Sequence, residues 1–292
     1  MKDTGINIGI NANKVRKILI KNGYQEVVSS VLRKSDSAVN SRFSVHGADS
    51  CDEFLRDCME TPLRKYICAA TPKIFEIGPC FRQGEADDTH RNEFYMMELY
   101  SANEELQAMK TLTEQIVSDV IGNHVPTTSI SLARVMLKDL NIDIRYDDTE
   151  ELVSAISSKY NHISGERNYQ VVNQYIDHLE KSICVRKDVL YFLEEYPVCT
   201  IDSAARYGDT NTIQRFEAFY NGLEIAHAFV DCMDGHEIQT RAAESFIEDI
   251  ETQELIRLTE QGYFLPTVGL GIGINRLCMM QGGNYNGERE RH

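Results

Sequence analysis

Three segments that lie far apart in the sequence carry side chains suited to binding a nucleotide. In the first, KIFEIGPCFRQGEADDTHRNEFYMMELYS, Arg82 ends one β candidate and Phe94 begins the next, with a polar loop between them. Arginine binds a phosphate or carboxylate through two parallel hydrogen bonds, and phenylalanine offers a flat face to a base. Taken alone, the segment also fits a solvated hairpin loop without any ligand.

The second segment, RFEAFYNGLEIAHAFVD, places two carboxylates across a predicted hairpin. Its turn, Asn221-Gly222, is the strongest short hairpin signal in the chain, and Glu217 and Glu224 lie on either side of it. We expect both carboxylates to reach the same face of the sheet. Such a pair suits Mg2+, which prefers oxygen ligands together with substrate phosphates. Ordinary surface acids are the alternative.

The third segment, GLGIGINRLCMM, alternates glycine with apolar residues and then places Arg276 where a helix begins. Alternating glycines let a ligand approach a strand closely. The spacing differs from the dinucleotide-binding GxGxxG, and no βαβ context surrounds it. By itself this repeat is weak, but with the other two segments it predicts one shared nucleotide site.

A sheet assembled from hairpins must position these segments. Helical spacing and turn signals predict helices over 11–23, 104–121 and 235–261, a strand over 24–28, and a mostly helical region over about 132–193. Hairpins with helices packed on the sheet predict an α+β fold and not a doubly wound one. Because no repeat or linker divides the chain, we expect one domain over 1–292 with a helical insertion at about 132–193.

The composition narrows the functional classes. Lys+Arg 30 against Asp+Glu 45 gives a net charge of -15, which opposes non-specific binding to nucleic acid. The eight cysteines show neither a CxxC pair nor the spacing of a zinc site. No apolar run has the length of a membrane span, and the first residues lack the pattern of a signal peptide. We therefore expect a cytoplasmic protein without membrane contact.

The three segments together resemble the lysyl branch of the class II aminoacyl-tRNA synthetases. The segment IFEIGPCFRQGEADDTHRNEFYMMELY resembles motif 2 of that family, and GLGIGINRLCMM resembles motif 3. The metal-binding strand pair is similar to RFEAFYNGLEIAHAF, and the strand between motifs 2 and 3 is similar to LEEYPVCTIDSAA. Motif 1 is similar to NANKVRKILIKNGYQEVVSSVL. The likeness extends over nearly the whole chain. It is greatest to stand-alone paralogues without an anticodon-binding domain, typified by the elongation factor P–(R)-β-lysine ligase. It implies an antiparallel sheet flanked by helices, and a homodimer formed through motif 1.

The resemblance also assigns roles around ATP and Mg2+. It implies that Arg82 contacts the substrate carboxylate and the α-phosphate, and that His90 lies near the outer phosphates. Phe94 would stack on one face of adenine and Arg276 on the other, with Arg82 and Arg276 as the catalytic residues. Glu217 and Glu224 would hold Mg2+.

The resemblance places the amino acid in a pocket of acidic and polar side chains. Glu60 would bind the α-amino group, while Glu98, Tyr100 and Asp231 would bind a side-chain ammonium. Burying such a cluster is costly unless a cation joins it, and a substrate amine is one such cation. His227 also falls in this pocket. The expected substrate is therefore lysine or another diamino acid.

Several positions depart from the family pattern. Motif 2 usually reads Phe-Arg-x-Glu, but FRQGE displaces the acid by one position, so Glu85 can bind ATP only if the loop bulges. His227 replaces the asparagine common in lysyl enzymes, and Asp231 is one methylene shorter than the usual glutamate. Ser30 stands near the position of the motif 1 proline.

The sequence therefore predicts an ATP-dependent amino-acid ligase that forms an aminoacyl-adenylate. The expected lack of an anticodon-binding domain and the net charge of -15 favour transfer to a non-tRNA acceptor, such as a protein lysine, a carrier protein or a small amine. Charging of tRNA is the first alternative. A non-catalytic paralogue that senses an amino acid is the second, because fold does not fix function.

Overall fold

The fold is built on one large sheet, seen in a computed structural model that describes residues 4–37, 41–46, 52–84, 91–200, 203–245 and 249–281. Its strands are β1 (Gln25–Glu26), β5 (Lys73–Phe81), β6 (Glu93–Ala102), β7 (Thr127–Ser131), β8 (Leu190–Pro197), β9 (Thr212–Tyr220), β10 (Leu223–Val230) and β11 (Thr267–Gly273). Their order is β1-β5-β6-β11-β10-β9-β8-β7. All neighbours from β5 to β8 pair antiparallel, whereas the edge strands β1 and β7 pair in parallel. A small second sheet contains β2 (Leu32–Arg33), β3 (Ser44–His46) and β4 (Asp52–Leu55).

Both predicted hairpins are present. Strand β5 pairs with β6, and β9 pairs with β10 around Asn221 and Gly222. These two turn residues have φ values of 52° and 78°, the left-handed conformation that a two-residue type I′ turn requires. The strand expected over 24–28 forms only the two residues of β1. The α+β fold class is confirmed.

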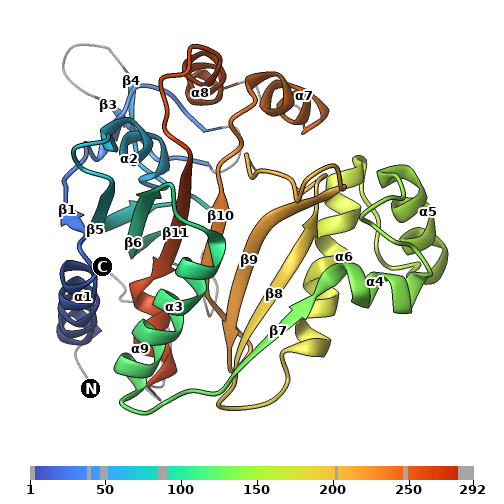
Figure 1. Cartoon of the computed structure of the whole chain (residues 1–292), viewed down its shortest axis with the longest axis horizontal. Helices are drawn as coiled ribbons and strands as arrows, with labels where there is room; N and C mark the ends of the chain where they lie inside the picture. Colours follow the sequence, from blue (N-terminus) through green and yellow to red (C-terminus); the bar gives the residue numbers. More distant parts are fainter. Residues whose placement is uncertain are drawn as a thin grey trace.

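One face of the sheet is covered by α1 (Thr4–Lys21), α3 (Leu106–Ile121) and α9 (Ile274–Met280) (Figure 1). Helix α1 begins before the predicted start at Asn11. It buries Ala12, Val15, Ile18 and Leu19, whose spacing places them on one side of a helix. These side chains join the apolar residues of the central strands in the main core.

The opposite face is divided between two groups of helices. Helices α4 (Leu132–Leu140), α5 (Thr149–Lys159) and α6 (Asn168–Ile183) form a second core over β8 and β9 (Figure 1). Helix α2 (Glu60–Tyr66) packs on β5 and β6 instead. The helical prediction for 132–193 fails at its end, where β8 begins at Leu190. This stretch is buried on both sides, and burial alone does not separate a central strand from a helix.

The single helix predicted over 235–261 is wrong. The structure contains α7 (Gly235–Ser245) and α8 (Ile250–Glu260), which lie beyond the ends of β10 and β11 (Figure 1). Asp249 has an extended backbone, and its side chain accepts a hydrogen bond from the backbone N–H of Thr252. This N-cap starts a new helix. No helix in the described ranges is long and apolar enough to cross a membrane.

Candidate active site

The site face of the sheet is ordered by strand register into rows of side chains. Two neighbouring rows across β6, β11, β10 and β9 are Glu98–Gly271–His227–Glu217 and Tyr100–Gly269–Phe229–Arg215. A Cβ atom at Gly269 would lie 2.9 Å from the Tyr100 ring, and one at Gly271 would lie 2.8 Å from the methyl group of Met96. The alternating glycines of β11 therefore form a floor between side chains that lean over it.

A cavity of about 400 Å³ lies above this floor. Five of the residues predicted for the site line it: Glu60, Arg82, Glu98, Tyr100 and His227. The other predicted residues within the described ranges, Phe94, Glu217, Glu224, Asp231 and Arg276, lie outside its walls. Glu85 and His90 lie outside the described residues. Four segments separated in sequence thus meet around one cavity.

The cavity contains a buried carboxylate and a neutral imidazole. Glu98 is 5% exposed, and one of its oxygens accepts a hydrogen bond from the backbone N–H of Met59 at 3.0 Å. Burial raises the pKa of Glu98 to about 7, and the nearby charge of Asp57 raises it further. Burial and the charges of Arg215 and Arg82 hold the pKa of His227 well below its usual value. At neutral pH, His227 is therefore uncharged and Glu98 is poised to ionise beside a cation.

One end of the cavity adjoins a cationic and aromatic region. The Arg82 guanidinium lies 5.4 Å from the centre of the Phe94 ring. The Nη1 atom of Arg276 donates to the Glu224 side chain at 2.9 Å and to its carbonyl at 3.1 Å. These contacts hold two arginines and one aromatic face on the same side of the sheet, which suits a nucleotide with its phosphates.

Next to this region lies a group of carboxylates that the sequence only partly revealed. Glu217 and Glu224 share a face because an irregularity in the pairing follows Glu224, and Arg215 binds Glu217. Helix α6 adds Glu180 and Asp177, whose spacing places both on one side of a helix. Burial and the charge of Glu217 raise the pKa of Glu180 to about 9.

These carboxylates fit a metal site that the substrate phosphates complete better than one formed by protein ligands alone. Within the described ranges, no group of three or more His, Cys, Asp or Glu side chains is arranged to hold a metal ion on its own. Mg2+ commonly binds one or two carboxylates and takes its remaining ligands from water and substrate phosphates. Glu217 and Glu224, next to Arg276, match that pattern.

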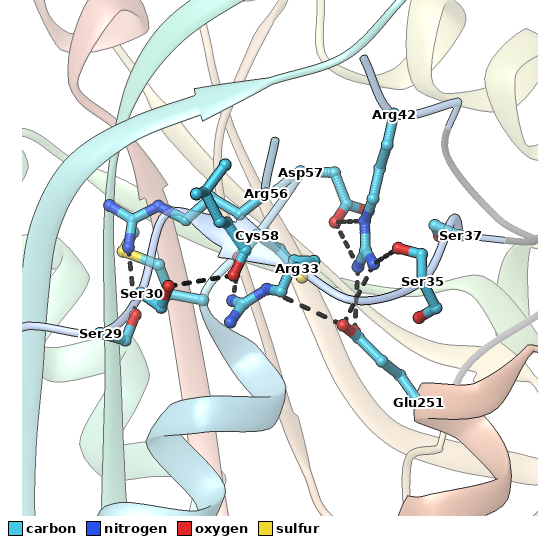
Figure 2. Close-up of polar contacts among 12 residues, drawn as sticks. Ser29, Ser30, Arg33, Ser35, Ser37, Arg42, Arg56, Asp57, Cys58 and Glu251 are labelled. Atoms are coloured by element: carbon cyan, nitrogen blue, oxygen red, sulfur yellow. Dashed lines mark hydrogen bonds and ion pairs between the residues drawn. The ribbon is translucent and has the colours of Figure 1, made fainter. Parts of the chain in front are cut away.

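The outer wall of the cavity depends on a cluster around Arg42, which Figure 2 shows between Asp57 and Glu251. The guanidinium donates to Asp57 at 2.8 Å, to the Ser35 carbonyl at 2.9 Å and to Glu251 at 3.1 and 2.9 Å. Arg33 lies 3.8 Å from Glu251. The first turn of α8 is thereby fixed to the small sheet. No sequence signal pointed to this cluster, because Arg42 and Glu251 are 209 positions apart.

Asp231 lies behind the wall of the cavity. It follows β10 and is fully buried, and its Oδ1 atom is 3.3 Å from Nη1 of Arg64 on α2. The Thr267 hydroxyl donates to its other oxygen. The sequence reasoning included Asp231 but missed Arg64, although Arg64 lies one helical turn after Glu60.

Family comparison agrees with this arrangement. The model of the family described as tRNA synthetases class II (D, K and N) matches residues 10–286. The chain belongs to this class II synthetase family. The predicted likeness of its motifs to class II synthetases is therefore confirmed at the level of the family.

Curated relatives of this synthetase domain carry the name lysine–tRNA ligase. The relative from Chloroflexus aurantiacus is 28% identical over 91% of this chain and 59% of its own length. Those from Saccharolobus solfataricus and Enterococcus faecalis are each 27% identical, over 94% and 92% of this chain and 60% and 59% of their own lengths. The chain thus spans about three fifths of the length of these relatives.

Proposed function

We propose that this chain activates an amino acid with ATP, forming an aminoacyl-adenylate and releasing pyrophosphate. The observation that carries the proposal is the cavity in which Arg82 lies with Glu60 and Glu98, next to the Phe94 ring. A cation for the reacting carboxylate and two anions for an α-ammonium are the groups that bind an amino acid by its backbone. Membership of the class II synthetase family supports the same reaction.

The proposed chemistry depends on positioning and charge. A carboxylate oxygen of the amino acid bonds to the α-phosphorus of ATP, and the bond from that phosphorus to the oxygen of the departing pyrophosphate breaks. Arg82 would bind both the carboxylate and the α-phosphate, which aligns them and offsets their negative charge. Because the nucleophile is already ionised, no general base is required. Glu60 would hold the α-ammonium and orient the carboxylate. The resemblance assigned Glu98 to a side-chain ammonium, but Glu98 accepts from the backbone N–H of Met59, next to Glu60, so we assign it to the α-ammonium as well.

The adenine and the phosphates would occupy the region beyond the cavity. Phe94 and Arg276 would bracket the base, and Glu217 and Glu224 would hold Mg2+. When bound, Mg2+ would neutralise charge on the phosphate oxygens. Glu180 lies beside this pair and adds a further carboxylate within reach. The nucleotide roles of Glu85 and His90 remain predictions.

The acceptor of the activated amino acid has two candidates. The net charge of -15 favours a protein, carrier protein or small amine, as in the paralogues typified by the elongation factor P–(R)-β-lysine ligase. The names of the curated relatives favour tRNA. A homodimer formed through the motif 1 segment belongs to the same proposal, as does a cytoplasmic location.

The amino acid expected from the sequence was lysine or another diamino acid. That expectation assigns Glu98, Tyr100 and Asp231 to the side-chain amine. The contact between Asp231 and Arg64 opposes it, because a cation of the protein already occupies that carboxylate.

ATP–pyrophosphate exchange over a panel of α- and β-amino acids tests the activation step. We expect one class of amino acid to support exchange, and Arg82→Ala to lower the rate by about 100- to 1,000-fold, the usual loss for one preorganised donor. Arg16→Ala is the matched control, since the contacts of Arg16 with Glu26 and Asn13 are exposed and far from the cavity residues in sequence. Normal exchange in Arg82→Ala would refute the assignment of the site.

A second assay separates the acceptors and the sensor alternative. Transfer of labelled amino acid to total tRNA would support the tRNA ligase, whereas transfer to protein or a small amine would support the other candidate. An amino acid that raises the melting temperature without supporting exchange indicates a sensor instead of a ligase.

A further inference from the structure

Asp231 lies at the far end of the amino-acid cavity, one row beyond Tyr100, Gly269 and Phe229. Val230 pairs with Val268 on β11, and the backbone N–H of Asp231 donates to the Thr267 carbonyl at 2.9 Å. The nucleotide region around Phe94 and Arg276 lies in the opposite direction along β6 and β11, beyond the Met96–Gly273 pair. An amino acid held by Arg82 therefore directs its side chain toward the Tyr100 row and then toward Asp231.

Arg64 meets Asp231 there, behind the cavity wall. Its side chain is 1% exposed and that of Asp231 is 0% exposed, and neither lines the cavity. The guanidinium also lies 4.7 Å from the centre of the Phe264 ring. Among the described residues, no guanidinium nitrogen of Arg64 makes a hydrogen bond that satisfies strict geometry. Asp231 is therefore the group that compensates the buried charge of Arg64.

This pair removes Asp231 from the groups available to a substrate. A guanidinium is a permanent cation in proteins, so Arg64 meets Asp231 as a positive charge. A substrate ammonium at Asp231 would place two buried cations against one carboxylate, and one of them would lack compensation. Displacing Arg64 would instead leave a fully buried guanidinium without an anion.

With Asp231 paired to Arg64, the row of Tyr100, Gly269 and Phe229 presents no carboxylate to a substrate side chain. The Tyr100 hydroxyl stays protonated, because burial and the surrounding carboxylates raise its pKa well above the usual value. Phe229 and Gly269 also line the cavity, as does Arg241, which forms an ion pair with Glu237. Together the three residues of the row offer apolar surface and a neutral hydroxyl to a side chain.

The other carboxylates in the cavity wall have partners of their own. Asp57 and Glu251 both bind Arg42, and Asp249 caps α8. Glu60 and Glu98 are assigned to the α-ammonium under the proposed function.

Resting on that proposed function, we infer that the activated amino acid has an uncharged side chain, and that Arg64 sets this preference by neutralising Asp231. Arg64 is thus a specificity-determining residue that acts through Asp231 and not by contact with the reacting atoms. The preference differs from the diamino substrate expected from the sequence.

Length-matched pairs of amino acids test the preference. The wild-type chain is assayed with norleucine against lysine and with norvaline against ornithine, by pyrophosphate exchange and by ligand-induced change in melting temperature. We expect kcat/KM to favour the uncharged member of the better pair by about tenfold or more, as one mismatched side-chain group commonly does. A preference for lysine or ornithine would overturn the inference and leave the activation proposal intact.

Two variants test the role of Arg64 itself. Arg64→Met removes the charge, keeps most of the volume and frees Asp231, so the kcat/KM ratio should move toward the amine-bearing member by about tenfold or more. The double variant Arg64→Met with Asp231→Asn removes both charges and should keep the wild-type preference. If the single variant does not fold, the double variant still tests the inference. A preference for lysine in the double variant would contradict it.

The two readouts separate this inference from the activation proposal. A rise in melting temperature with norleucine but not lysine, without exchange, would refute activation while supporting the preference of the cavity for an uncharged side chain. If no amino acid of the panel supports exchange or changes the melting temperature, both fail. An unchanged preference in a folded Arg64→Met variant would overturn the role of Arg64.

Discussion

The cluster that fixes α8 over the cavity predicts an asymmetry between its two partners. Glu251 accepts two hydrogen bonds from Arg42, and its side chain is 22% exposed. Arg42 and Asp57 have side chains only 2% and 3% exposed (Figure 2). Losing Glu251 and losing Arg42 should therefore have different consequences for the free energy of unfolding.

The expected losses of unfolding free energy follow from the contacts that remain in each variant. In Glu251→Gln, Arg42 keeps Asp57 and the Ser35 carbonyl, so we expect a loss of about 1–2 kcal/mol, as for a partly exposed hydrogen bond to a charged group. In Arg42→Met, the buried Asp57 carboxylate loses its ion pair with Arg42, and we expect the free energy of unfolding to fall by about 3–5 kcal/mol.

Urea unfolding of both variants and the wild type at one pH measures this difference. Glu26→Gln is the control, because its ion pair with Arg16 is exposed and should contribute only about 0–1 kcal/mol. Amide hydrogen exchange should also show faster local opening at the start of α8 in Glu251→Gln. An Arg42→Met variant that loses no more stability than Glu251→Gln would refute the reasoning about buried charge.

Three further predictions concern the site. The folded-state pKa of Glu98, about 7, exceeds the ordinary 4.5. The contribution of Glu98 to the free energy of unfolding is therefore present below pH 4.5 and is lost as the pH rises through 7. Glu98→Gln should flatten this part of the plot of unfolding free energy against pH, measured by urea unfolding. Gly269→Ala should raise the KM for the amino acid more than for ATP in exchange assays, because the added Cβ would meet the Tyr100 ring at 2.9 Å. Glu180, with its pKa raised to about 9, loses its contribution to the free energy of unfolding as the pH rises through 9. The melting temperature of Glu180→Gln relative to wild type should therefore be higher at pH 9 than at pH 6. The opposite trend would contradict the assigned repulsion from Glu217.

Local patterns explain why the hairpins could be predicted. Asn221 and Gly222 adopt left-handed backbone conformations at low cost, and apolar alternation on either side sets the strand faces. The glycines of β11 lie on the site face because side chains alternate along a strand. The helix break at Asp249 was missed because the composition on both sides of it suits a helix, and only the cap marks the new start.

The sequence by itself determined the two hairpins, the α+β class and three of the charged side chains at the cavity, Glu60, Arg82 and Glu98, since each depends on residues close together in the chain or on matching motifs. Only the tertiary structure decided which charges compensate one another. Arg64 reaches Asp231, and Arg42 reaches Glu251, through the packing of α2 on β6 and of α8 on the small sheet. An ion pair between distant segments leaves no periodic signal in the sequence, and its existence depends on burial that forms only when those elements pack together.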